Sequence, residues 1–331
     1  GLGGVWHPGA VRSRWRQVGL VIGGLAALPA AGLAVLYLAP SLQASRALLG
    51  MAASFIPFAI PLWLVSLVAV IGCGRGRGRW WAVPVGVGLV AQICWALPYL
   101  PHRPPEPNGE PLRLLALNLQ YGRGDPGQVA AVVAREQPDV LVFTEVTDAF
   151  LNRAREGLAG YPYRAGSSDP NGTSAAGTIV LSRTPVTELE HLTTTFGNHV
   201  VRVSRPNGSV VLVAAHPVNP LSGAAAWAQE PQLIRDAVLR HQGQPVVVAG
   251  DLNATLEHLT VRRLLRAGLT DAADQAGAGW LPTFSTETGP VPPVIAIDHV
   301  LVNSRVTATT VTAFEVEGSD HRGLVVTLTV R

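Results

Sequence analysis

The amino-terminal third most constrains what this chain can fold into, because no acidic residue occurs before Glu106. Within it, apolar stretches without a charged residue cover residues 17–45, 47–74 and 80–102. Each is longer than the roughly 20 residues with which a helix crosses the hydrocarbon core of a bilayer. A cleaved signal peptide needs only one such stretch. Residues 1–100 are therefore predicted to form a membrane anchor with three transmembrane helices.

Arginines predict the orientation of this anchor, since cytoplasmic loops carry an excess of basic residues. Three precede the first stretch, one lies between the first and second, and three separate the second from the third. In chain order they are Arg12, Arg14, Arg16, Arg46, Arg75, Arg77 and Arg79. The amino terminus is thus expected in the cytoplasm, and everything after residue 100 outside it, in a multi-pass protein of the cell membrane. No Asp, Glu or Arg lies mid-span, so contact with the bilayer is expected to serve anchoring rather than transport.

The remainder divides into a linker and one domain. Residues 101–111 are rich in proline and are predicted to form a semi-extended tether, at most roughly 40 Å long. Residues 112–331 have the size of one compact domain. From Glu106 onward, 17 Arg face 22 Asp plus Glu, a net charge of −5. This balance argues against a polyanion such as duplex DNA as the natural partner, without excluding a local basic patch.

Short apolar runs and helical patterns mix along residues 112–331. Strands are expected at 112–118, 140–145, 177–182, 200–204, 210–216, 246–251, 296–302, 306–314 and 324–330. Helices are expected at 126–137, 148–157, 224–240 and 256–267. Hairpin-like spacings beside longer helical connections predict an α+β fold, a mixed-sheet sandwich with helices outside.

The stretch VVVAGDLNAT, residues 246–255, carries the strongest chemical signal. Its apolar run predicts a buried strand, and Gly250 marks a place where backbone must come close to another group. Asp251 and Asn253 lie two apart on an extended segment, so their side chains point the same way. A carboxylate that orients water and an amide that donates to a charged oxygen would suit a phosphoester. Ordinary turn chemistry is the competing interpretation.

Other polar residues stand at predicted strand ends or interrupt the apolar pattern nearby. Asn118, Glu145 and His216 end predicted strands, Asp298 lies within one, and Asp320 and His321 lie in the loop before the last strand. Each alone is consistent with a solvent boundary, an edge histidine or a turn. Together they suggest a metal site in which Glu145 and Asp320 supply charged oxygens and Asn118 a neutral one, with His216 and His321 at the phosphoryl oxygens. Oxygen ligands without cysteine favour Mg²⁺ or Mn²⁺ over a structural zinc.

The order Asn, Glu, His, Gly-Asp-x-Asn, Ile-Asp-His, Ser-Asp-His over residues 112–331 resembles the endonuclease/exonuclease/phosphatase superfamily. DNase I-like nucleases, inositol polyphosphate 5-phosphatases and bacterial sphingomyelinases share that fold. The resemblance implies a four-layer αββα sandwich. It also implies Glu145 as the main metal ligand, Asp320 as a second metal carboxylate and Asp298 as the partner that holds the catalytic His321. His216 would bind phosphate, and Asp251 and Asn253 would orient water and stabilise the transition state.

Two departures from the family pattern concern specificity. The first motif reads Leu-Asn-Leu-Gln, which leaves the role of Gln120 open, and His216 continues into an unusual Pro-Val-Asn-Pro loop. A three-span anchor before such a domain is similar to VanJ-type membrane proteins associated with glycopeptide-antibiotic resistance.

The sequence therefore predicts a membrane-anchored, extracytoplasmic, Mg²⁺-dependent phosphoesterase. Its expected substrate is a phosphate ester or pyrophosphate on a lipid carrier. A surface nuclease and a non-catalytic binding or signalling domain are the alternatives.

Overall fold

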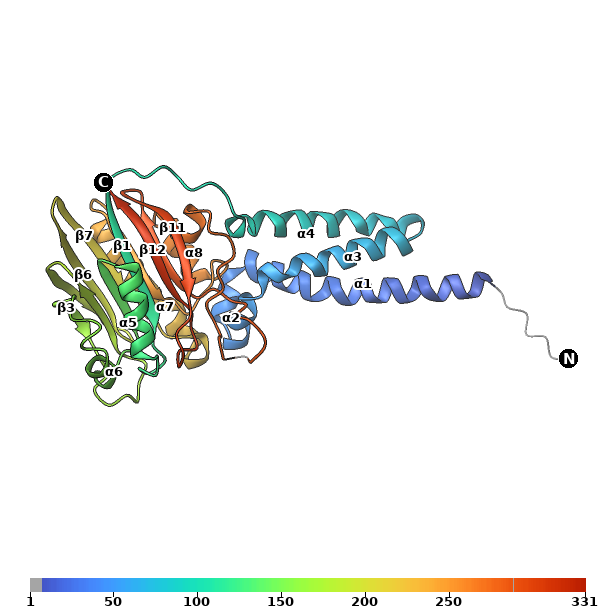
Figure 1. Cartoon of the computed structure of the whole chain (residues 1–331). Helices are drawn as coiled ribbons and strands as arrows, with labels where there is room; N and C mark the ends of the chain where they lie inside the picture. The colour runs from blue at the N-terminus through green and yellow to red at the C-terminus, as the bar shows by residue number, and fades with distance from the viewer. Residues whose placement is uncertain (1–7, 288) are drawn as a thin grey trace.

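A computed structural model of the chain describes residues 8–287 and 289–331. A helical region, residues 8–99, projects from one side of a β-rich sandwich domain, residues 110–331 (Figure 1). Residues 1–7, which belong to the predicted anchor, lie outside the described residues.

Two six-stranded sheets form the centre of the sandwich domain. The first sheet has, from edge to edge, β11 (Val306–Phe314), β12 (Gly323–Val330), β1 (Glu110–Asn118), β2 (Val140–Thr144), β4 (Thr178–Ser182) and β3 (Tyr163–Ser167). The second has β5 (Val186–Leu192), β6 (Asn198–Arg205), β7 (Gly208–Ala214), β8 (Val246–Asp251), β10 (Asp298–Asn303) and β9 (Leu269–Asp271). Only the β1–β2 and β7–β8 pairs are parallel, so both sheets are mixed.

Side-chain alternation along the strands explains the layers. Leu114 of β1 points between the sheets, where it joins Leu212 of β7, whereas Leu115 points outward to the helices that cover the first sheet. Those helices are α5 (Pro126–Glu136) and α6 (Asp148–Arg153). On the far side, α7 (Ala224–His241) and α8 (Leu259–Arg266) cover the second sheet. The result is the predicted α+β sandwich with four layers.

The structure adds strands that the sequence patterns did not predict. These are β3, β5 and β9, and all three lie at sheet edges. Their sequences are short or polar, as in VTELEHL for β5 and LTD for β9. An edge strand exposes one side to solvent and therefore lacks the apolar run by which central strands are recognised.

The helical region consists of α1 (Pro8–Leu38), α2 (Ala47–Ala53), α3 (Ala59–Cys73) and α4 (Ala82–Trp95), with short 3-10 turns between them. In Figure 1, α1, α3 and α4 lie side by side, whereas α2 lies against the sandwich domain. Within the described residues, the helices long and apolar enough to cross a membrane are 13–38 and 56–73. Most of their surface contacts no other part of the chain.

Of the three helices predicted to cross a membrane, the described residues therefore contain two that are by themselves long and apolar enough to do so. The α-helical part of the third apolar stretch, α4, has 14 residues. At about 1.5 Å per residue it is about 21 Å long, short of the about 30 Å of a hydrocarbon core. The 3-10 turn Gly76–Trp81 delays its start, and a second 3-10 turn, Leu97–Tyr99, contains Pro98 and ends it. The second stretch is also broken, because α2 turns away from α3.

Hydrogen bonds fix the helical region to the sandwich domain. Gln43 accepts from the backbone N–H of Leu259 at 2.7 Å, and the His258 imidazole donates from Nε2 to the Gly50 carbonyl at 2.7 Å. The Arg262 guanidinium donates to the Tyr37 carbonyl at 2.6 Å and lies over its ring.

The predicted tether does not leave the domain free to move. Just before the tether begins, the Tyr99 hydroxyl donates to the buried Glu257 carboxylate at 2.7 Å. Tyr99 also packs edge-on against Trp280 of the sandwich domain. The site's distance from the helices is thus set by this junction rather than by the reach of residues 101–111.

Candidate active site

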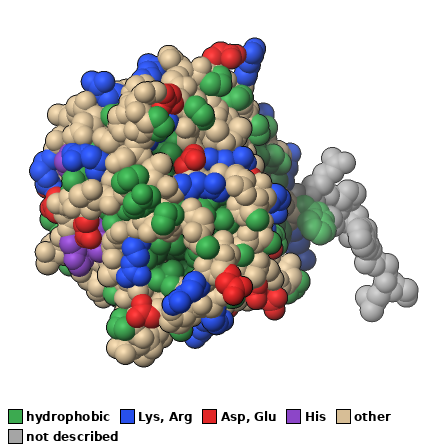
Figure 2. Space-filling model, turned by 60° about the vertical axis from the view of Figure 1, so that its left-hand side comes forward, with side chains coloured by type: hydrophobic (Ala, Val, Ile, Leu, Met, Phe, Trp, Pro, Cys, Tyr) green, Lys and Arg blue, Asp and Glu red, His purple; other side chains and the backbone are tan. Residues whose placement is uncertain are grey.

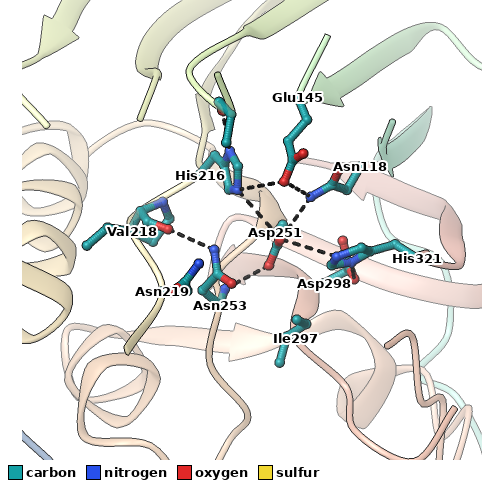
Figure 3. Close-up of polar contacts among 12 residues, drawn as sticks. Asn118, Glu145, His216, Val218, Asn219, Asp251, Asn253, Ile297, Asp298 and His321 are labelled. Atoms are coloured by element: carbon teal, nitrogen blue, oxygen red, sulfur yellow. Dashed lines mark hydrogen bonds and ion pairs between the residues drawn. The ribbon is translucent and has the colours of Figure 1, made fainter. Parts of the chain in front are cut away.

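Polar residues gather at one end of the two sheets because parallel strands end at the same edge. Asn118 ends β1 and Glu145 follows its parallel neighbour β2. In the second sheet, Asp251 ends β8 and His216 lies just beyond its parallel neighbour β7. Figure 3 shows these side chains, with His321, pointing toward Asp251.

Asn118 joins the two sheets through its amide nitrogen. Its Nδ2 donates to Glu145 Oε1 at 3.1 Å and to Asp251 Oδ2 at 3.0 Å. Its Oδ1 accepts from the backbone N–H of Gln120 at 2.9 Å. That oxygen is therefore already engaged, and in this orientation Asn118 positions the two carboxylates instead of offering the neutral metal ligand that the sequence predicted.

Left-handed backbone brings Glu145 and Gln120 together. Their φ angles are 52° and 45°, a conformation that side-chain-bearing residues adopt at a cost and that clusters at functional sites. The Tyr121 backbone N–H donates to Glu145 Oε2 at 3.0 Å and holds the carboxylate in place. Gln120 Oε1 is buried without a hydrogen-bond partner, and Gln120 and Glu145 line the same cavity. A buried carbonyl oxygen of this kind needs a partner, and a cation would provide one.

Asp320 supplies a second carboxylate near Glu145. Burial raises the pKa of Asp320, the charge of His321 opposes that rise, and the Glu145 carboxylate adds to it. Two carboxylates beside an unpaired amide oxygen form a hard oxygen donor set, which suits Mg²⁺ or Mn²⁺. Glu145, Asp320 and Gln120 therefore fit a divalent cation.

Asp251 lies at the centre of the site, with only 2% of its surface exposed. Its Oδ1 accepts from the backbone N–H of Asn253 at 2.8 Å, and Asn253 has the left-handed φ of 48°. Burial raises the pKa of Asp251, and the charge of His321 opposes that rise. The preceding Gly250 has a φ of 138°, and a Cβ there would lie 2.2 Å from the Ala215 carbonyl oxygen. The close backbone approach that the sequence predicts at Gly250 is present.

Asp298 and His321 form a buried hydrogen-bonded pair. His321 Nδ1 lies 2.7 Å from Asp298 Oδ2, so the ring directs Nε2 toward Asp251 Oδ2 at 3.7 Å. Burial alone would lower the pKa of His321, but the charges of Asp298 and Asp251 raise it to about 10. The imidazole is thus charged at neutral pH and can donate from Nε2.

His216 has the opposite character. Its Nδ1 faces the Ala175 carbonyl at 3.1 Å, and since a carbonyl only accepts, Nδ1 carries the proton. Burial lowers the pKa of His216, although the charge of Asp251 opposes this. A neutral His216 therefore presents the lone pair of Nε2, which lies 3.6 Å from Asp251 Oδ2. The sequence-based role of His216 as a donor to phosphate requires that it first gain a proton.

One acidic cluster differs from the predicted metal set. Ligand atoms of Asp251, Asp298 and His321 lie within 4.8 Å of one another. Asp298 and His321 already satisfy each other through their hydrogen bond, so this cluster is better described as a group of buried opposite charges than as a cation site. Among the described residues, neither Glu145 nor Asp320 has a partner of opposite charge at hydrogen-bond distance, since Glu145 lies 3.9 Å from His216 Nε2 and Asp320 lies 3.8 Å from His321 Nε2.

A cavity of about 480 Å³ opens over these residues, and part of its lining was not predicted. Phe196 stacks on the His216 ring, and Phe284 packs against His321. Met51 and Phe55 of the helical region also line it. No pattern within one segment could identify them, because only the tertiary fold brings these distant residues to the site.

Comparison with known proteins identifies the family of the sandwich domain. Residues 115–321 match the endonuclease/exonuclease/phosphatase family, and the chain belongs to that family. It matches no curated protein.

Solved structures show the same fold. An endonuclease/exonuclease/phosphatase from Beutenbergia cavernae DSM 12333 is 25% identical, with a TM-score of 0.51 over 66% of this chain and 72% of that one. One from Bacteroides vulgatus is 19% identical, with a TM-score of 0.53 over 67% of this chain and 100% of that one. A humanized D. rerio TDP2 is 19% identical, with a TM-score of 0.51 over 66% of this chain and 98% of that one.

Proposed function

We propose that this protein is a divalent-cation-dependent phosphoesterase anchored in a membrane. The observation that carries the proposal is the convergence on Asp251 of side chains from both sheets, with the charged Asp298–His321 pair on one side and Glu145 on the other. Family membership supports phosphoester hydrolysis as the reaction class.

Each residue has a role that its contacts allow. Glu145, Asp320 and Gln120 would hold Mg²⁺ or Mn²⁺. Such a cation, when bound, neutralises phosphoryl charge and stabilises the leaving oxygen. Asp251 orients a water molecule and accepts its proton as the water attacks phosphorus and the bond to the leaving oxygen breaks.

Hydrogen-bond donors then stabilise the charge that develops on the phosphoryl oxygens. His321 donates from Nε2. Asn253 Nδ2 gives one N–H to the Pro217 carbonyl at 3.0 Å and keeps the other for the substrate. His216 adds a further donor once it has taken up a proton, which the negative charge of the bound substrate favours.

The placement of arginines supports an extracytoplasmic sandwich domain. The turn that carries Arg75, Arg77 and Arg79 joins α3 to α4 at the end of these two helices that points away from the sandwich domain (Figure 1). The exposed Trp80 and Trp81 follow in the same turn, where amphipathic rings suit a membrane interface. We infer that α1 and α3 cross the bilayer with this end in the cytoplasm, and that α4, lengthened by the 3-10 turns on either side of it, carries the chain back across to the outer domain. Protease added to intact spheroplasts should remove the sandwich domain; its survival would contradict this topology.

A lipid-linked phosphate or pyrophosphate is the proposed substrate. The site cavity borders the helical region, which would hold it near the membrane surface. On the face of the domain in Figure 2, arginines are interspersed with acidic and uncharged side chains and form no continuous basic stripe. Duplex DNA would need such a stripe.

Substrate class can be tested with the full chain in lipid nanodiscs. The assay measures products from polyprenyl pyrophosphate, phospholipid and DNA, with and without Mg²⁺, and uses Asp251→Asn as the inactive control. Release of phosphate from the polyprenyl substrate by wild type alone is the expected result. Cleavage of DNA in preference to both lipids would instead identify a surface nuclease, and no product from any substrate would favour a binding domain. Altered antibiotic sensitivity on deletion would test a role in cell-envelope resistance.

A further inference from the structure

One wall of the site cavity comes from the helical region. Met51 lies in α2 and Phe55 follows it, and both line the cavity together with Asp251 and His321. Their side chains keep 39% and 47% of their surface exposed. These apolar groups are thus open to whatever occupies the cavity.

The loop after His216 completes this wall. It leads into the 3-10 turn Pro220–Ser222, in which Leu221 lines the cavity with 67% of its surface exposed. We define the apolar wall as Met51, Phe55, Pro220 and Leu221.

Close packing builds the wall from both regions. A Cβ added to Gly50 of α2 would lie 3.3 Å from Pro220, so a glycine at this position permits α2 to pack on the loop. Asn219 caps the turn by accepting from the Ser222 backbone N–H at 2.9 Å. The Val218 backbone N–H donates to the buried Glu230 carboxylate at 2.9 Å. The loop is therefore held in place, and its departure from the usual family sequence coincides with its contact with α2.

The cavity therefore has two chemically different sides. Asp251, Asn253 and His321 supply charge and hydrogen bonds, whereas the apolar wall supplies surface that water solvates poorly. Apolar side chains that surround a few convergent polar groups are typical of a ligand site. A molecule that joins a phosphate to an apolar chain would satisfy both sides, and the wall lies where the apolar helices meet the domain.

We propose that the apolar wall binds the first carbons of the apolar chain of a phosphorylated amphiphile, so that the helical region forms part of the substrate site and sets its chain preference. This inference rests on the proposed function, because it places the phosphate at Asp251 and His321. It assigns Phe55 and Leu221 a role in substrate specificity, so that the helical region would do more than anchor the protein.

Binding measurements test the wall without requiring turnover. The full chain in lipid nanodiscs with Mg²⁺ is titrated with hexylphosphonate and with methylphosphonate, which share a headgroup and are both water-soluble. Wild type should bind hexylphosphonate at least about tenfold more tightly, since each buried methylene adds to affinity. Phe55→Ala and Leu221→Ala should each lower this ratio about fivefold. Leu48→Ala is the matched control, because Leu48 lies on α2 with 75% of its surface exposed but does not line the cavity.

Two outcomes would overturn the inference. A ratio near one in wild type would show that no apolar subsite exists, and equal losses for both phosphonates in Phe55→Ala would show a merely structural role. Melting temperatures identify any variant that fails to fold, and Leu221→Ala then provides the second test from the other region. Tighter binding of single-stranded DNA than of hexylphosphonate, weakened in Phe55→Ala, would assign the wall to base stacking and overturn the proposal.

Turnover separates this inference from the proposed function. If hexyl and methyl pyrophosphate are hydrolysed with equal kcat/KM, and Phe55→Ala changes both alike, the wall is refuted while the phosphoesterase stands. If no phosphate ester is hydrolysed, the proposed function fails, and the apolar wall is then not part of a substrate site. Tighter binding of hexylphosphonate than of methylphosphonate would in that case show only an apolar binding site.

Discussion

Leu28 in α1 and Leu141 in β2 are the same residue type in opposite surroundings. The first keeps 72% of its surface exposed, whereas the second is fully buried between β1, β4 and the helices on the first sheet. The helical region thus presents apolar surface outward, and the sandwich domain encloses it. In water only the second arrangement is favourable, and the proposed membrane anchoring would account for the difference by placing the helical region in lipid.

The charged and the apolar side chains of the site are also unevenly divided between the two regions. All the charged groups proposed for catalysis belong to the sandwich domain, and the helical region offers the site only apolar or small side chains. Yet the two regions meet at a buried junction around Gln43 and His258. The position of the site and its proposed substrate specificity therefore depend on both regions.

The largest difference between the regions is expected in catalysis. Asp251→Asn keeps the shape of the side chain but removes the proton acceptor, and should lower kcat by about 10³-fold or more. Leu28→Ala should leave kcat unchanged. Turnover by full chains of equal melting temperature checks the pair; a similar rate for Asp251→Asn and wild type would remove Asp251 from the mechanism.

Stability should separate the regions next. Leu141→Ala leaves a cavity between layers and should reduce the free energy of unfolding by about 3 kcal/mol. Leu28→Ala removes an exposed side chain, which under the proposed topology faces lipid, and should change the free energy of unfolding by less than about 0.5 kcal/mol. Denaturant unfolding in nanodiscs measures both. Equal losses would mean that α1 is packed against protein and not against lipid.

The Asp298–His321 pair should give a somewhat smaller effect on rate. Asp298→Asn weakens the interaction that orients and charges the imidazole, and should lower kcat about 10²-fold with little change in metal affinity. His321→Ala should be about as damaging, and the double variant little worse, because the two act as a unit. Additive losses would contradict this. Reduced stability with normal turnover per folded molecule would show that Asp298 only satisfies a buried strand end.

Much of the sandwich domain could be predicted because its central strands are apolar on both faces. The site residues were predictable for a related reason, since a polar residue that ends such a strand interrupts a simple pattern, as at Asn118 and Asp251. The edge strands β3, β5 and β9 lack that pattern and were missed. The orientation of the Asn118 amide could not be predicted, because its oxygen accepts from the Gln120 backbone N–H and sequence does not reveal this contact.

The helical region was predicted less accurately than the sandwich domain. Apolar length alone suggested three equal spans, but the 3-10 turns before and after α4 shorten the third. The junction with the sandwich domain could not be foreseen either, since Gln43 and His258 carry no local signal. Gln43 bonds to Leu259 and His258 to Gly50, in each case between segments more than 200 residues apart.

The smallest expected effect concerns pH at this junction. Burial lowers the pKa of His258 to about 4, although its hydrogen bond to the Gly50 carbonyl opposes this. Because the folded pKa lies below the unfolded value of about 6.5, the stabilisation is fully present above about pH 6.5 and is lost as the pH falls toward 4. Hydrogen exchange in residues 43–53 should therefore be several-fold faster at pH 5 than at pH 7.5, after correction for intrinsic rates. His258→Gln should abolish that difference, and an unchanged difference would exclude His258 as its cause.

Metal removal tests the central claim most directly, namely that strand-end oxygens of the sandwich domain form a cation-dependent phosphoesterase site. The full chain in nanodiscs is stripped with a chelator, and Mn²⁺ or Mg²⁺ is then added while phosphate release is followed. Activity should fall to background and return with either cation in wild type. In Glu145→Gln it should stay at least about 10³-fold lower, because a charged ligand is lost from the cation. Turnover that survives chelation, or that is restored equally in Glu145→Gln, would contradict the account.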